Sequence, residues 1–179
     1  MTGRVPGDTL LAARRATALY SRELEHLSDE DLRGDSTAPG WSRSHVVAYV
    51  ALEARALAIA LDGLASITHP DYEPVGEWGA AVDFTATLGA SALRNLHHHT
   101  VVHLNVACRD LPDAAWSVPI EVSGRRAAPS ALMARRELQI VKGTLALRTG
   151  ARVGIDSTGL PVVTPSAPLF DSADVTTKP

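Results

Sequence analysis

Residues 39–49 read PGWSRSHVVAY and contain a turn signal followed by the start of a helix. Pro39 and Gly40 are both strong breakers of regular structure, and here they follow one another. Ser42 is a residue type that caps helix N-termini well. The tryptophan before it, Trp41, can anchor the helix end by packing. A helix is therefore predicted to begin at about residue 43 and to continue to about residue 65.

Apolar side chains recur every three or four residues along this segment, which places them on one face of a helix. They are Val46, Val50, Ala54, Leu57 and Leu61. Apolar positions and helix-end residues also predict helices over residues 8–27, 80–111 and 130–148. Four helices with one long crossover favour a mainly α-helical bundle.

The pattern changes between the last two predicted helices. Apolar residues alternate with others over residues 118–122 and Gly124 follows, which predicts a short β-hairpin or crossover. Residues 153–155 and 160–163 can pair in the same way, and a flexible tail is expected beyond them. We thus expect a helical domain over residues 1–150 and a small C-terminal extension over residues 151–179.

Composition excludes several classes of protein. The chain has 179 residues, 45% of them hydrophobic, with a formal net charge of -3. This charge argues against a nucleic-acid-binding protein, and no apolar run is long enough to span a membrane. The single cysteine, Cys108, excludes an intrachain disulfide framework and a thiolate zinc cluster. The N-terminus lacks a signal-peptide pattern, so a cytoplasmic location is expected. Lysine occurs only at positions 142 and 178, and the other basic residues are arginines, a bias typical of GC-rich bacterial genomes.

Three segments together carry a resemblance to a known family. They are residues 39–49, residues 111–116 (LPDAAW) and residues 132–141 (LMARRELQIV). Over about residues 8–150 their order and spacing resemble the mycothiol-dependent maleylpyruvate isomerase family, within the DinB-like superfamily of four-helix-bundle metalloproteins. The resemblance implies a DinB-like bundle, a divalent metal such as zinc, and mycothiol as co-substrate. Members open the second helix with a Gly-Trp-Thr-Arg-Gly-His segment.

The family's metal ligands are only partly present in this sequence. Members hold the metal with a histidine, a glutamate and a second histidine, and the matching positions here are Tyr49, Glu137 and Val141. By residue type Glu137 is a metal ligand, Tyr49 is a poor one and Val141 is none. A catalytic metal needs about three protein donors, so we expect that this site is lost and that no metal or mycothiol is used.

Histidines elsewhere leave one alternative open. His99 and His103 are four residues apart on one predicted helix, and such a pair can bind zinc with a carboxylate such as Glu137. In the other interpretation these histidines, with the neighbouring His97 and His98, are solvated or partly packed side chains.

The substituted positions suggest acid/base chemistry. His45, Tyr49 and Glu53 recur every four residues and form one ridge of the helix. A phenol and the two carboxylates of Glu53 and Glu137 in a partly apolar cavity can act as general acids and bases. In the plainer interpretation, Tyr49 only fills the volume of the lost metal and Glu53 faces solvent.

Other residues are expected to help bind a substrate. Arg135 or Arg136 can grip an anionic group in a bidentate manner, and His45 and Trp41 lie near the predicted site. Trp41 also has the simpler interpretation of a packing anchor.

Three hypotheses about function follow. The first is a metal-independent enzyme that isomerises, cyclises or eliminates a small anionic or polyketide-like molecule of specialised metabolism. The second is a mycothiol-dependent isomerase or transferase that keeps a metal through other ligands. The third is a non-catalytic protein that binds or sequesters a small molecule. In each case we expect a monomer or homodimer with a small-molecule partner and neither a nucleic-acid nor a membrane partner.

Overall fold

A computed structural model describes residues 6–65, 78–155 and 161–164. Its helices and strands, in chain order, are α1 (Pro6–Glu25), η1 (Asp31–Arg33), α2 (Arg43–Leu64), α3 (Trp78–Ala86), α4 (Ala90–Asp110), η2 (Asp113–Ser117), β1 (Ile120–Val122), β2 (Arg125–Ala127), α5 (Pro129–Ala146), β3 (Arg152–Ile155) and β4 (Pro161–Thr164). The predicted mainly helical class is confirmed. None of the helices in these described ranges is long and apolar enough to cross a membrane.

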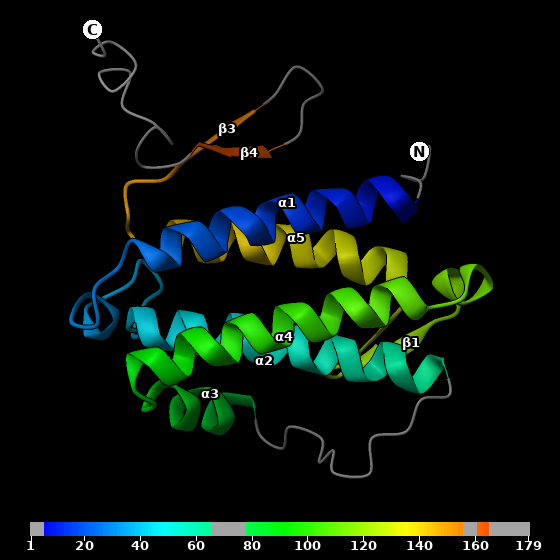
Figure 1. The fold of residues 1–179 in the computed structure, drawn as a ribbon, viewed down its shortest axis with the longest axis horizontal. Helices are drawn as coiled ribbons and strands as arrows, with labels where there is room; N and C mark the ends of the chain where they lie inside the picture. The colour runs from blue at the N-terminus through cyan, green and yellow to red at the C-terminus, as the bar shows by residue number, and fades with distance from the viewer. Residues whose placement is uncertain (1–5, 66–77, 156–160, 165–179) are drawn as a thin grey trace, which may run out of the picture.

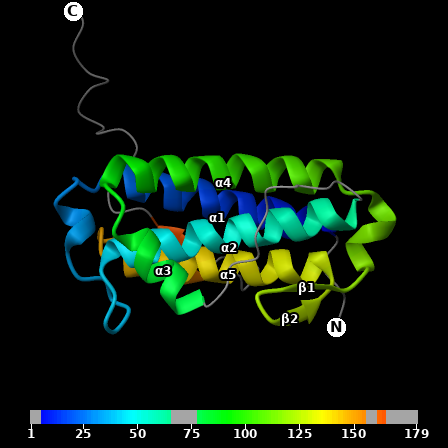
Figure 2. The same ribbon diagram turned by 90° about the horizontal axis from the view of Figure 1, so that it is seen from below.

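Four long helices form the bundle, as predicted. α1 packs along α5, and α2 packs along α4 (Figure 1). The colour gradient shows that α1 and α5 run in one direction and that α2 and α4 run in the opposite direction. Seen from below, α1 and α4 lie in the upper half of the bundle and α2 and α5 in the lower half (Figure 2). The short α3 packs against the outer side of α2.

The turn and the capping residue predicted in residues 39–49 are found at the N-terminus of α2. Gly40 has φ +77°, a left-handed conformation that glycine adopts at little cost. The Ser42 hydroxyl accepts a hydrogen bond from the His45 backbone N–H, and the Ser42 N–H donates to Nδ1 of His45, 3.3 Å away. This reciprocal capping box satisfies backbone donors that an open helix end would leave unpaired.

α2 is the central helix of the core. The five residues of its predicted apolar stripe are all buried, and so are Val47, Ala48, Ala51 and Ala58 on its other sides. Burial on several sides follows because α4, α5 and α3 all pack against this helix. Small alanine side chains allow that close packing.

The long third helix predicted over residues 80–111 is wrong in one respect. The structure has two helices here, α3 and α4, separated at residues 87–89. Gly89 is the N-cap of α4, with an extended backbone (φ −62°, ψ 153°). The hydroxyl of Thr87 bonds to the carbonyl oxygen of Phe84 and closes the end of α3. Gly89 therefore separates two helices and does not lie inside one.

Both predicted β-hairpins are present. β1 pairs with β2 in an antiparallel register, with Val122 opposite Arg125. Ser123 (φ +53°) and Gly124 (φ +72°) form the two-residue turn between them, and positive φ at both positions matches the twist of a tight hairpin. β3 pairs with β4. The tail expected to be flexible, from residue 165, lies outside the described residues.

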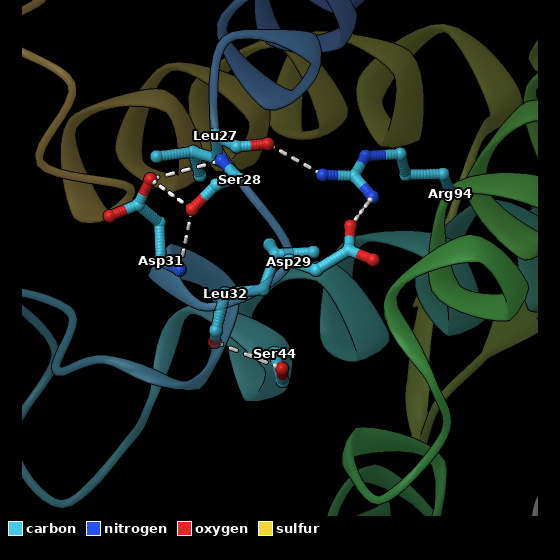
Figure 3. A network of polar contacts seen from close by, with 7 residues as sticks. All are labelled: Leu27, Ser28, Asp29, Asp31, Leu32, Ser44 and Arg94. Atoms are coloured by element: carbon cyan, nitrogen blue, oxygen red, sulfur yellow. Dashed lines mark hydrogen bonds and ion pairs between the residues drawn. The ribbon is translucent and has the colours of Figure 1, made fainter.

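The connection between α1 and α2 is fixed by polar contacts to α4 and to the first turn of α2 (Figure 3). Arg94 of α4 donates to the Asp29 carboxylate at 2.7 Å and to the Leu27 carbonyl oxygen at 2.6 Å. Ser44 of α2 donates to the carbonyl oxygen of Leu32 at 2.9 Å. These bonds hold the connection against the end of the bundle at which α2 begins.

Candidate functional site

Two polar side chains meet on the outer part of α2. Tyr49 and Glu53 are one helical turn apart, and the Tyr49 hydroxyl donates a hydrogen bond to Glu53 Oε1 at 3.3 Å. Both side chains are half-buried. The predicted ridge of residues spaced by four therefore brings this phenol and this carboxylate into contact.

A third polar group comes from α5. Nε2 of Gln139 donates to the Tyr49 hydroxyl oxygen at 3.1 Å. Sequence reasoning missed Gln139, although it follows Arg135 by four residues and therefore shares its face of α5. The phenol thus accepts one hydrogen bond and donates another.

The electrostatic surroundings keep the Tyr49 phenol protonated. Burial, and next the negative charge of Glu53, raise the pKa of Tyr49 above its usual value. Gln139 and Arg135 act in the opposite direction but do not cancel this increase. At neutral pH Tyr49 is therefore a hydrogen-bond and proton donor, and a phenolate is disfavoured.

A cleft opens beside Glu53, and Tyr49 lies next to its lining residues Glu53 and Gln139 without lining it itself. It has a volume of about 60 Å³ and lies between α2, α5 and the β1–β2 hairpin. Its lining residues are Glu53, Leu57, Val122, Ser123, Arg125, Leu132, Arg135 and Gln139. One carboxylate faces two guanidinium groups there, on an apolar floor formed by leucine and valine side chains. Such a set can hold an anionic molecule next to a base.

Aromatic rings border Tyr49 on the side of α3. The ring centroids of Trp41 and Trp78 lie 5.5 Å and 6.4 Å from that of Tyr49. Trp41 also stacks on His45, with centroids 6.2 Å apart. Nε2 of His45 lies 3.7 Å from an Asp83 carboxylate oxygen, whereas Nδ1 serves the capping box. Trp41 and His45 thus support Tyr49 and the start of α2.

The structure places the remaining predicted site residues elsewhere. Glu137 is 9% exposed and is not among the residues that line the cleft. Arg136 is 2% exposed and lines a different cavity, between α1 and α4. Of the two adjacent arginines, only Arg135 reaches the cleft. Arg125, the first residue of β2, also lines the cleft, although the pattern of the sequence favoured a solvated side chain there.

The residues present do not fit the metal that the resemblance implies. Val141 offers no donor atom, and Tyr49 has a raised pKa and is bonded to Glu53 and Gln139. His103 Nε2 lies 2.7 Å from an Asp62 carboxylate oxygen, and His99 is exposed. Within the described ranges, no three histidine, cysteine, aspartate or glutamate residues are placed to share a metal ion.

Comparison with known proteins identifies the relatives of this chain. Residues 13–139 match the family described as "Mycothiol maleylpyruvate isomerase N-terminal domain". A crystal structure of a mycothiol-dependent maleylpyruvate isomerase is similar, with a TM-score of 0.73 and 30% identity over 80% of this chain. The chain spans 61% of that protein's length. A histidine-to-alanine mutant of such an isomerase gives a TM-score of 0.73 and 27% identity, over 94% of this chain and 82% of the other. No curated protein matches the sequence.

Proposed function

Because this chain belongs to the mycothiol maleylpyruvate isomerase N-terminal domain family and has its DinB-like helical fold, we propose that it is an enzyme acting on a small molecule. The reaction is a metal-independent proton transfer that isomerises, cyclises or eliminates a small anionic substrate. The observation that carries this proposal is the contact between Tyr49 and Glu53 beside a cleft with two arginines.

Glu53 is the base in this proposal. An ionised carboxylate can take a proton from a carbon next to a carbonyl group; the C–H electron pair then forms the C=C bond of an enolate, and the π pair of the carbonyl group moves onto its oxygen. Returning the proton to another carbon of the same substrate completes an isomerisation without any change in redox state. The half-buried position of Glu53 at the cleft leaves it accessible to a bound molecule.

Tyr49 stabilises the negative charge that this step creates. Its raised pKa keeps the phenol protonated, so the hydroxyl can redirect its hydrogen bond from Glu53 to the new oxyanion. A donor already held in place acts strongly on charge that develops only in the transition state. Gln139 fixes the phenol oxygen during this change of partner.

Arg135 and Arg125 define the substrate class. Two guanidinium groups at the mouth of the cleft favour a molecule with at least one carboxylate, held by charge-assisted hydrogen bonds. The apolar floor suits a short carbon chain. The substrate is therefore a small unsaturated or keto carboxylic acid in this proposal.

The alternative that the family supports is dependence on mycothiol, which is stated for the two similar crystal structures, together with the metal that the sequence resemblance implies. Two features of this chain weigh against it. Val141 stands at the position of one family ligand, and the Tyr49 hydroxyl is already engaged by two side chains. No step of the proposed reaction involves a metal.

Solvent-exchange measurements on protein pretreated with a chelator test the proposal. A panel of unsaturated and keto dicarboxylates is incubated with the protein in D₂O, and deuterium uptake is followed by NMR. We expect uptake with wild type, a large loss with Glu53→Gln and a smaller loss with Tyr49→Phe. Glu121→Gln changes an exposed glutamate on β1 and is the matched control.

The other outcomes overturn the proposal in distinct ways. Uptake that appears only with added zinc and a thiol would favour the metal-dependent alternative. Binding of panel members without uptake in any condition would show a binding protein. Equal uptake in Glu53→Gln and wild type would remove Glu53 from the reaction.

A further inference from the structure

Arg136 has a partly unsatisfied guanidinium group in the centre of the bundle. It lies on α5, is 2% exposed, and donates from Nη1 to the carbonyl oxygen of Val50 at 2.8 Å. Its Nε and Nη2 atoms are buried and have no hydrogen-bond partner among the residues that the structure describes. Two of its three nitrogens therefore have unused donors.

A cavity lies against this arginine, on the side of the bundle away from the Tyr49–Glu53 cleft. Its volume is about 140 Å³, and we call it the α1–α4 groove because most of its walls come from these two helices. Its lining residues are Ala13, Arg14, Thr17, Ala18, Ser21, Val101, Leu104, Asn105, Met133 and Arg136. None of these residues lines the cleft.

The groove combines apolar walls with a single internal charge. Alanine, valine, leucine and methionine side chains form most of its surface, and Arg14 bonds to Asn105 in an exposed position. The hydroxyls of Thr17 and Ser21 bond to backbone carbonyl oxygens of α1. Among the described residues that line this cavity, Arg136 therefore offers buried guanidinium donors without a partner.

The charge on Arg136 persists at neutral pH. Burial is the main cause that lowers its pKa, to about 10, which still leaves the group protonated. The negative charge of Glu53 acts against that decrease, and this residue does not line the groove. A buried cation whose donors are unpaired is costly, so an anion that reaches it gains a strong interaction.

We propose that the α1–α4 groove is a second binding site, which takes a small carboxylic acid with a short apolar chain or ring. The carboxylate oxygens accept parallel hydrogen bonds from Nε and Nη2 of Arg136. These two atoms form the edge of a guanidinium that matches a carboxylate in a bidentate manner. The apolar part of the ligand lies between α1 and α4, against Leu104 and Met133.

The size of the groove selects the ligand. An apolar cavity of about 150 Å³ in another protein holds a molecule of benzene. The α1–α4 groove, at about 140 Å³, suits a benzene ring or a branched chain of similar size. Benzoate combines such a ring with a carboxylate and is the probe of choice.

Binding of benzoate by the full chain tests the proposal. Titration calorimetry gives the affinity, and methyl NMR gives the location through Val101, Leu104 and Met133 in the groove and Val122 in the cleft. We expect the groove methyls to shift. Benzyl alcohol, which lacks the charge, is expected to bind about 10-fold or more weakly, as the loss of a charge-assisted hydrogen bond predicts.

Three variants make the result specific. Ala18→Phe places a ring in the groove from an exposed position on α1, so it blocks binding without disturbing the core. Ala92→Phe makes the same change at an exposed alanine of α4 that does not line the groove, and it is expected to bind benzoate as wild type does. Arg136→Met is expected to lose the preference for benzoate over benzyl alcohol.

Three results would overturn the proposal. The first is absence of benzoate binding at millimolar concentration, which would mean that water alone satisfies Arg136. The second is a change of NMR shift confined to the methyl groups of Val122 in the cleft. The third is equal affinity for benzoate in Ala18→Phe and wild type. Because the groove and the cleft share no lining residue, this test is independent of the enzymatic proposal.

Discussion

The hydroxyl oxygen of Tyr49 lies 3.3 Å from Oε1 of Glu53, one turn further along α2. This contact joins a phenol to a carboxylate at the edge of a cleft that also exposes Arg135. The negative charge of Glu53 raises the pKa of Tyr49, after the larger effect of burial. The two groups are therefore coupled, and changing one must alter the titration of the other.

Replacing Glu53 by glutamine is expected to lower the pKa of Tyr49 towards the ordinary value of a tyrosine without reaching it. The substitution removes the nearby negative charge, whereas the burial of the ring remains. NMR of carbon-labelled tyrosine, assigned with Tyr49→Phe, measures this titration. Glu121→Gln, on the exposed face of β1, should leave it unchanged. An unaltered Tyr49 titration in Glu53→Gln would show that the two groups do not interact in solution.

Acidification is expected to destabilise the protein through His97. Burial, and next the charge of Arg136, lower the pKa of His97 from 6.5 to about 4. The unfolded chain thus takes up this proton at a higher pH than the folded chain does. Stability is then lost as the pH falls from about 6.5 to about 4, by up to roughly 3 kcal/mol at 1.36 kcal/mol per pKa unit.

Urea unfolding at several pH values checks this expectation. His97→Phe should reduce the pH dependence in that window, whereas His98→Gln, at the exposed neighbouring position, should retain it. The same slope in His97→Phe and wild type would assign the acid sensitivity to other groups.

Alanine at position 143 is expected to destabilise the bundle. A Cβ atom on Gly143 would lie 3.1 Å from Cγ2 of Val50 and 3.3 Å from Cε2 of Tyr20, and both neighbours are fully packed. Overpacking of this kind costs about 1–3 kcal/mol, which outweighs the helical advantage of alanine over glycine, about 1 kcal/mol.

Gly63→Ala is the matched control, because nothing lies within 4 Å of the Cβ position on this exposed glycine of α2. We expect it to raise the free energy of unfolding by up to about 1 kcal/mol. Denaturant unfolding measures both variants. A Gly143→Ala protein as stable as Gly63→Ala would mean that α1, α2 and α5 are less closely packed than described here.

Removing the cap of α2 is expected to weaken the whole bundle. Ser42→Ala eliminates the oxygen that accepts from the His45 N–H and should cost about 1 kcal/mol in the free energy of unfolding. Ser42→Thr keeps an acceptor and should lose only a small part of this. Thermal unfolding distinguishes the two variants, and equal losses would show that the backbone at Gly40 and Trp41, not the cap, defines the helix start.

Much of the fold could be predicted because local chemistry and periodicity agree. Ser42 and the stripe from Val46 to Leu61 specify α2 by themselves, and Gly124 marks a turn that the structure contains. The separation of α3 from α4 could not be predicted in this way. No proline marks residues 87–89, and Gly89 acts as a cap only because α3 turns back to pack on α2.

The site was harder to predict for a similar reason. The spacing of Tyr49 and Glu53 is local, so their contact could be expected from the helix alone. Whether Arg135 or Arg136 reaches the cleft depends on how α5 is rotated against three other helices, and adjacent residues on a helix point about 100° apart. Arg125 reaches it only because the β1–β2 hairpin folds beside α2 and α5.

The pairing of α1 with α5 also determines when the protein can fold during its synthesis. α1 leaves the ribosome before α2 and α4, and α5 leaves it after them, yet α1 and α5 pack along each other. Tyr20 of α1 touches the position of Gly143, more than a hundred residues later. A nascent chain can pack α2 with α4 early, but α1 remains without its main partner until α5 has emerged. The apolar face of α1 is therefore exposed to water and to other chains for the whole of that interval, which makes the nascent chain prone to aggregation.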